Sequence, residues 1–370
     1  MIDDLAALTP TLTSLGWNDQ LERWAKEFET SQGETQVRGR IARVSRGYSV
    51  VFTGGDAVMV HSSSERAALA EPPATGDYVL IGHDDEHNQV ITATSSRRTA
   101  LVRRAPGRVP MPQILAANID HVLVMHGLDR ELNIRRLERQ LVVAFDSGAT
   151  PVIVLTKSDY DQDLDDVLDR VNQAAAGVEV ITTSVESGDG LDRLAELCTG
   201  SHTSVLLGLS GIGKSTLVNK LSDGVVQLTG EVRITDRRGR HTTVTRDLIP
   251  FPSGGMMIDT PGIREIGLWQ AHHGLDLAFA ELSSAAQQCR FADCSHGQEP
   301  GCAVQQLLKD GGSSQARLDH WKSLHDELAE QDQQLEEFER RNESRQRARA
   351  QDRQNKQRPK KSGRRNRDEL

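Results

Sequence analysis

A nine-residue stretch near the middle of the chain constrains the fold more than any other feature. It fits the pattern G-x-x-x-x-G-K-[ST], follows the apolar run TSVLL and opens a segment with helical spacing. Strand, glycine loop and helix in this order form a P-loop, whose N–H groups surround phosphate oxygens at a helix N-terminus. We therefore predict an α/β domain with a nucleotide site. The loop residues are Gly208, Leu209, Ser210, Gly211, Ile212, Gly213, Lys214, Ser215 and Thr216.

Two of these residues carry the predicted chemistry. Lys214 is expected to contact the β- and γ-phosphates and to act in catalysis, because its ammonium can neutralise charge on both groups. Ser215 is expected to bind Mg²⁺ through its hydroxyl.

Two segments before the P-loop resemble the guanine-binding motifs of GTPases. The first ends an apolar strand and matches [NT]-K-x-D; its carboxylate could accept two hydrogen bonds from guanine, a donor pair that adenine lacks. The second resembles S-A-x-x-G-x-G-L, with Val in place of Ala, and would offer a backbone N–H to the base. An ATPase would leave the carboxylate idle. The residues are Thr156, Lys157, Ser158, Asp159, Ser184 and Val185. Thr replaces the usual Asn at the first position, but its hydroxyl could still bridge toward the P-loop.

The segments after the P-loop resemble the two switches of GTPases. Thr242 or Thr243 would bind Mg²⁺ in the first switch, and we assign Ser215 and Thr243 as the expected magnesium ligands. The second switch matches D-x-P-G, with Asp259 acting on the metal and the Gly262 N–H on the γ-phosphate. Ile263 follows, where other GTPases place a water-orienting Gln. His241 is a chemical candidate for that role, although an exposed loop histidine is the alternative.

The order of these motifs differs from the usual one. GTPases run from the P-loop through both switches to the guanine motifs, whereas here both guanine motifs precede the P-loop. This order predicts a circularly permuted GTPase domain, in which the second switch connects directly to the next domain.

That next domain contains a compact set of metal-binding residues: Cys289, Cys294, His296 and Cys302. Three thiolates and one imidazole within 14 residues suit tetrahedral zinc. Because four protein ligands leave no open position, the site is expected to be structural.

The first hundred residues predict a different unit. Five short alternating segments between residues 36 and 100 indicate a β-barrel of the OB type, a fold that often binds oligonucleotides. Residues 1–35 predict an amphipathic helix that could dock on the body or on a partner. Two groups of arginines could contact RNA or could only be surface charge. They are Arg38, Arg40, Arg43 and Arg46, and then Arg97, Arg98, Arg103, Arg104 and Arg108.

Charge is distributed unevenly along the chain. The net charge is −9, yet residues 340–370 hold thirteen Lys or Arg against four Asp or Glu. A basic tail on an acidic body suggests a polyanionic partner, or else a solvated tail without one. With no long apolar run or signal peptide, we expect a cytoplasmic protein without membrane contact.

We therefore expect a multidomain chain of five parts. An N-terminal extension (1–35) precedes the OB-type barrel (36–105), the central circularly permuted α/β P-loop GTPase (106–275), a C-terminal zinc-binding α module (276–335) and a basic, disordered tail (336–370).

The barrel, the permuted GTPase with its G-R-H-T-T segment and the C-x4-C-x-H-x5-C module, in this order, resemble the RsgA (YjeQ) family of small ribosomal subunit biogenesis GTPases over residues 36–325. The resemblance implies a monomeric GTP hydrolase with GTP/GDP, Mg²⁺ and one Zn²⁺. It also implies binding to the 30S subunit and its 16S rRNA, stimulation by that subunit, and a late assembly role that includes release of another maturation factor. A nucleotide-gated RNA-binding protein with incidental hydrolysis is the alternative.

Overall fold

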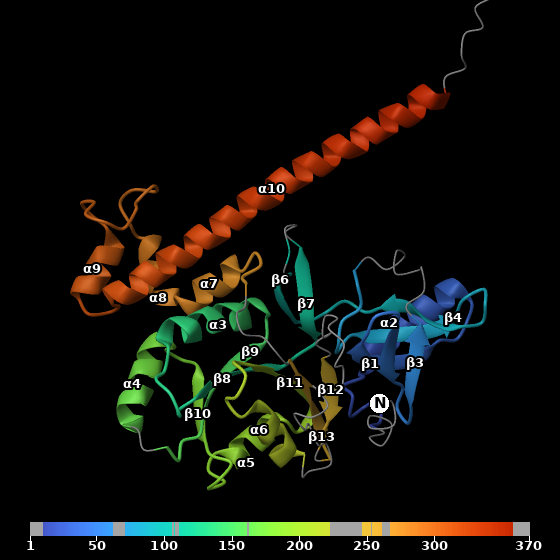
Figure 1. Cartoon of the computed structure of the whole chain (residues 1–370), viewed down its shortest axis with the longest axis horizontal. Helices are drawn as coiled ribbons and strands as arrows, with labels where there is room; N and C mark the ends of the chain where they lie inside the picture. Colours follow the sequence, from blue (N-terminus) through green and yellow to red (C-terminus); the bar gives the residue numbers. More distant parts are fainter. Residues whose placement is uncertain are drawn as a thin grey trace, which may run out of the picture.

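The computed structural model of the 370-residue chain describes most of its length. Within the described ranges a barrel, an α/β domain and a helical C-terminal part follow one another (Figure 1). The described residues are 10–61, 71–105, 107, 111–160, 163–222, 246–252, 254–260 and 267–357, with side chains up to residue 348.

The barrel has the five strands that the sequence predicts. Strand order is β1-β2-β3-β5-β4, and β4 pairs back onto β1, so the sheet closes. Gly39 allows this closure, since a Cβ there would lie 2.4 Å from the Val51 side chain. The strands are β1 (Val37–Val44), β2 (Tyr48–Phe52), β3 (Ala57–His61), β4 (Tyr78–His83) and β5 (Gln89–Thr94).

The N-terminal helix α2 (Asp19–Gln32) docks on this barrel rather than projecting from it. Asn18 caps its first turn, and its apolar side packs Ala25 against Leu80. Arg38 of the barrel binds Glu22 and Glu29 of the helix. Of the two positions left open by the sequence, the structure places the helix on the body.

The structure also corrects the hypothesis that the barrel arginines form RNA-binding clusters. Arg38, Arg43 and Arg97 form ion pairs within the chain, and Arg40 is only 1% exposed. Arg40 donates to the carbonyls of Leu15, Gly76 and Asn118 at 2.9–3.0 Å, and so joins the N-terminal segment, the barrel and the next domain. These partners are distant in sequence, which is why strand periodicity alone does not reveal them. Arg46 stays exposed, Arg98 is exposed but pairs with Asp120 at 2.9 Å, and Arg108 lies outside the described residues.

A hairpin, β6 (Ala100–Arg104) and β7 (Pro112–Ala117), crosses the boundary that we expected between residues 105 and 106. The Arg104 N–H donates to the Gly267 carbonyl, and its guanidinium binds Gln334 of the long C-terminal helix. The hairpin therefore links the barrel side of the molecule to its C-terminal part.

The α/β domain is organised on a sheet of order β10-β9-β8-β11-β13-β12, parallel except for β12. Helices α3 and α4 pack on one face, and α5 and α6 on the other. Strand β12 also pairs with β1 at Arg43 and Asp247, so one sheet continues into the barrel. The elements are β8 (His121–Gly127), α3 (Ile134–Asp146), β9 (Thr150–Thr156), α4 (Leu164–Ala174), β10 (Glu179–Thr183), α5 (Leu191–Leu197), β11 (Gly200–Leu207), α6 (Lys214–Leu221), β12 (Asp247–Pro250) and β13 (Gly254–Asp259).

The C-terminal part is helical and ends in a helix longer than expected. Its helices are α7 (His272–Ala278), α8 (Ala280–Ala286), α9 (Ala303–Lys309) and α10 (Gln315–Gln357). We expected a disordered tail from residue 336, but α10 runs on through 43 residues and projects beyond the body (Figure 1). Good helix formers, the absence of Gly and Pro from its sequence, and Glu-to-Arg pairs four residues apart explain the extension.

The base of α10 is fixed to the α/β domain by a buried ionic network. Arg317 bonds to Glu138 of α3 at 2.7 Å and to Glu281 of α8 at 2.6 Å. His320 bonds to the second oxygen of Glu138 at 2.5 Å. Each charge in this network therefore has an opposite or hydrogen-bonding partner, and the network joins the base of α10 to α3 and α8.

In the described part of the chain, no helix combines the length and the apolar character needed to cross a membrane.

Candidate nucleotide-binding site and metal centre

The P-loop lies between β11 and α6, in the context that the sequence predicts. Gly208 is needed for close packing, because a Cβ there would lie 2.7 Å from the Met125 carbonyl oxygen. Gly211 and Gly213 have φ values of 83° and 97°, a region that side chains disfavour. The glycines thus allow a tight turn that leads into the N-terminus of a helix.

Lys214 lies folded over this turn. Its Nζ donates to the carbonyls of Gly208 at 2.7 Å and Leu209 at 2.6 Å, and the residue is 7% exposed. The ammonium is therefore already within the loop where phosphate oxygens would bind. Ser215 follows at the start of α6 and is partly accessible.

The guanine motif begins where β9 ends, two strands away from β11. The Thr156 hydroxyl donates to the Ile212 carbonyl of the P-loop at 2.7 Å. This is the bridge that the sequence suggested for a Thr at this position. Burial lowers the pKa of neighbouring His126 to about 4, so this imidazole is neutral and adds no charge to the site.

The carboxylate of the motif is held by the second guanine segment. Asp159 is exposed, and one of its oxygens accepts from the buried Ser184 hydroxyl at 2.5 Å. The same hydroxyl oxygen accepts from the N–H groups of Glu186 at 3.2 Å and Ser187 at 3.3 Å. From the sequence we expected only a backbone contact from this segment to the base. The hydroxyl of Ser184 also orients Asp159, and the presence of a serine at this position was the sequence feature that could have indicated this role.

The residues expected on the metal side are only partly described. Asp259 ends β13 and is 5% exposed, and the parallel register with β11 brings it beside the P-loop. Thr260 donates its hydroxyl to the Leu206 carbonyl, which fixes the strand end. His241, Thr242, Thr243 and Gly262 lie outside the described residues.

All four motif segments with described residues therefore meet at one edge of the sheet. They follow β9, β10, β11 and β13, whose carboxyl ends point the same way because these strands are parallel. Ligands of open α/β sheets bind at this edge. Asp129, which no motif marked, also reaches it and contacts Lys157.

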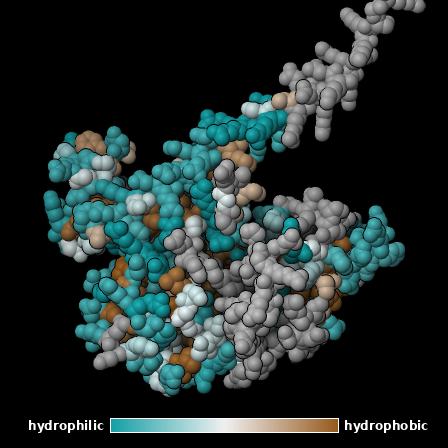
Figure 2. Space-filling view, in the orientation of Figure 1, coloured by the Kyte–Doolittle hydropathy of each residue, from teal (hydrophilic) through white to brown (hydrophobic). Residues whose placement is uncertain are grey.

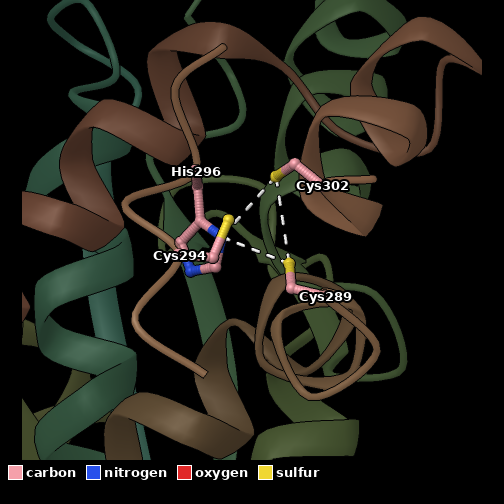
Figure 3. A group of neighbouring side chains, drawn as sticks. All are labelled: Cys289, Cys294, His296 and Cys302. Atoms are coloured by element: carbon pink, nitrogen blue, oxygen red, sulfur yellow. Dashed lines mark hydrogen bonds between the residues drawn. The ribbon is translucent and has the colours of Figure 1, made fainter. Parts of the chain in front are cut away.

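The metal centre has the donor set that the sequence predicts, and its four side chains converge (Figure 3). Their donor atoms lie within 4.8 Å of one another. His296 Nδ1 is 3.5 Å from Cys289 Sγ and 3.7 Å from Cys302 Sγ, and the two sulfurs are 3.9 Å apart. Tetrahedral zinc requires about 3.5 Å between sulfur and nitrogen and about 3.8 Å between sulfurs. The residues therefore fit zinc, with Cys294 as the fourth ligand.

The metal loop is supported by the base of α10. The His296 carbonyl accepts from Gln305 at 2.9 Å and from Lys322 at 3.2 Å, while its ring lies 5.5 Å from the Trp321 ring. Hence the metal centre and the long helix form one unit.

Comparisons with known proteins decide the family. A sequence profile described as RsgA GTPase matches residues 94–269. The small ribosomal subunit biogenesis GTPase RsgA of Streptomyces coelicolor is 42% identical over 319 residues, which cover 85% of each chain. This chain belongs to the RsgA family. Its Methanosarcina acetivorans relative of the same description is 37% identical, over 87% of this chain and 86% of the relative.

The remaining comparisons agree with the permuted order. A profile described as 50S ribosome-binding GTPase matches residues 203–347, beginning just before the P-loop, whereas the RsgA profile also covers the guanine motifs upstream. The crystal structure of YjeQ from Thermotoga maritima has a TM-score of 0.60 at 24% identity, covering 80% of this chain and 99% of that one. YloQ, described as a circularly permuted GTPase, has a TM-score of 0.56 at 23% identity, covering 80% and 96%.

These findings confirm the predicted fold class and the family. The chain is a GTP hydrolase of the RsgA family, with an N-terminal barrel, a central P-loop GTPase domain and a C-terminal Cys₃His cluster. GTP or GDP and Mg²⁺ are the ligands that such a GTPase domain implies.

We predict that Asp159→Asn weakens GTP binding by about 10- to 100-fold, because a charged acceptor for two guanine donors becomes a neutral amide. Affinity for xanthosine triphosphate should rise, since its 2-oxo group can accept from the new amide. Nucleotide titration by fluorescence checks both effects. Asp165→Asn, an exposed carboxylate on α4, is the control. Unchanged base preference in Asp159→Asn would refute the guanine assignment.

For the metal centre, Cys294→Ser should remove the bound zinc and lower the melting temperature of the protein, because a structural zinc contributes directly to folding. Elemental analysis and thermal unfolding are the two measurements. Cys198→Ser alters a buried thiol outside the cluster and should retain the metal. A Cys294→Ser protein with full zinc content and unchanged stability would contradict the predicted ligand set.

Proposed function

We propose that this GTPase binds the small (30S) ribosomal subunit and acts as a late assembly switch whose hydrolysis the subunit stimulates. The family supports the proposal, because its members are described as small ribosomal subunit biogenesis GTPases. GTP would favour the subunit-bound form, and hydrolysis would release it.

The proposed coupling between GTP hydrolysis and subunit binding rests on one contact between the second-switch side and α10. The segment that leaves the second switch runs into α7, and Gln331 of α10 clamps it. The Gln331 amide oxygen accepts from the Gln270 N–H at 2.8 Å, its amide nitrogen donates to the Leu268 carbonyl at 2.7 Å, and the side chain is 2% exposed. A shift of the chain after Asp259 would therefore act directly on α10, the helix whose base supports the metal loop.

For the nucleotide, we assign roles to the residues at the sheet edge. Lys214 and the P-loop N–H groups would bind the phosphates, Asp159 the guanine, and Ser215 with Thr243 the Mg²⁺, which offsets phosphate charge. Asp259 would act on the metal, and the Gly262 N–H would donate a hydrogen bond to the γ-phosphate. Since Ile263 cannot orient water, we assign that function to His241 or to a group that the subunit supplies.

Contact with 16S rRNA would involve surfaces other than the paired barrel arginines. The projecting part of α10 is hydrophilic (Figure 2), and the sequence that continues it is strongly basic. Such a charge run suits the phosphate backbone of RNA. Of the barrel-side arginines that the sequence analysis named, Arg46 is exposed, and Arg98 is exposed although it pairs with Asp120.

We further propose that the Cys₃His cluster holds one structural Zn²⁺, because all four positions of a tetrahedron are filled by protein ligands. The protein would act as a monomer in the cytoplasm, where ribosomal subunits assemble, and would promote release of another maturation factor.

The decisive experiment measures GTP hydrolysis with and without purified small subunits. We expect stimulation of at least about tenfold, because a partner-supplied group can complete an incomplete site. Large subunits and ATP serve as controls, and neither should give a comparable rate. Equal slow rates in all conditions would remove the subunit as activator and favour a nucleotide-gated RNA-binding protein.

A variant of the clamp tests the coupling separately. Gln331→Ala should keep the basal rate, since the residue does not reach the nucleotide edge, but should reduce stimulation by about 3- to 10-fold, the effect of losing one or two hydrogen bonds. Gln333→Ala is exposed on the same helix and should behave as wild type. Full stimulation of Gln331→Ala would show that the clamp does not transmit the signal.

A further inference from the structure

The loop between β8 and α3 belongs to no recognised nucleotide motif, yet it is bonded to the guanine motif. The Leu128 N–H donates to the Thr156 carbonyl at 2.9 Å. In the next residue, Asp129, a carboxylate oxygen accepts from Lys157 Nζ at 2.7 Å. This loop therefore fixes both the backbone and the side chain of the motif.

Lys157 is held at two points. Besides the carboxylate, its ammonium donates to the Gly211 carbonyl of the P-loop at 3.2 Å. Its backbone has a φ of 60°, which is uncommon for a residue with a side chain. The aliphatic stem is thus stretched between the guanine loop and the P-loop, where it can lie along the face of a bound base.

The position of the carboxylate is itself built into the fold. It folds back over Gly127, where a Cβ would lie only 2.6 Å from Asp129 Oδ1. Arg130 is a second partner at 3.2 Å. Hydrogen bonds from Arg130 and Lys157 lower the pKa of Asp129 to about 2, so the carboxylate stays charged throughout the physiological range.

We propose that Asp129 is a positioning residue for guanine nucleotide binding, which acts by orienting Lys157 against the P-loop. The proposal rests on the assignment of the guanine site above. The proposal also explains how the site can use Thr156 in place of the usual Asn. The Thr156 hydroxyl makes one hydrogen bond to the P-loop, whereas an Asn would offer an amide. The contact from Lys157 to Gly211, held by Asp129, provides a second tether.

The test compares Asp129→Asn with wild type in nucleotide affinity and in steady-state hydrolysis. The Kd for GTP and for GDP should rise by a similar factor of about ten, because the contact lies on the base side and not at the γ-phosphate. The KM for GTP should rise in parallel, while kcat at saturating GTP changes less than twofold. Glu131→Gln removes an exposed charge from the same loop and is the matched control.

A double-mutant cycle separates positioning from a general effect on folding. In a Lys157→Met background, which keeps the stem but removes the ammonium, Asp129→Asn should change the Kd less than twofold. A tenfold loss that persists in this background would overturn the proposal, as would an Asp129→Asn protein that binds like Glu131→Gln. Failure of the guanine assignment is recognised independently, from unchanged base preference in Asp159→Asn.

Discussion

The parallel pairing of β11 with β13 is the interaction on which the rest of the structure depends. It places the end of the P-loop strand next to Asp259, so the groups that we propose for phosphate and for metal share one edge. Strand β13 also pairs with β12, and β12 in turn pairs with β1 of the barrel. One set of backbone hydrogen bonds therefore assembles the nucleotide site and orients the barrel against it.

The sequence predicted the parts of this molecule that depend on local pattern. The P-loop, the five barrel strands and the Cys₃His spacing each need only a short stretch of residues, and each was recognised correctly. Partners across the fold were not predictable in this way. Arg40 binds carbonyls that lie 25, 36 and 78 residues away, and only tertiary structure shows that this arginine is internal.

The same distinction applies at the nucleotide edge. Asp159 was marked by its motif, whereas Asp129 follows a buried strand and is separated from Lys157 by 28 residues. A carboxylate that follows a strand can serve many purposes. The role of Asp129 becomes apparent only because β8 and β9 are paired in the sheet, which brings Asp129 to Lys157.

The length of α10 has a mechanical consequence. Its base is fixed by Arg317 and Gln331, while about 26 residues extend beyond the clamp, a span of roughly 39 Å at 1.5 Å per residue. By simple geometry, a tilt of about 5° at the base moves the far end by roughly 3 Å over that span. In the proposed switch, the helix would therefore act as a lever arm, so that a small displacement beside the nucleotide would become a shift comparable to a hydrogen-bond length at its tip.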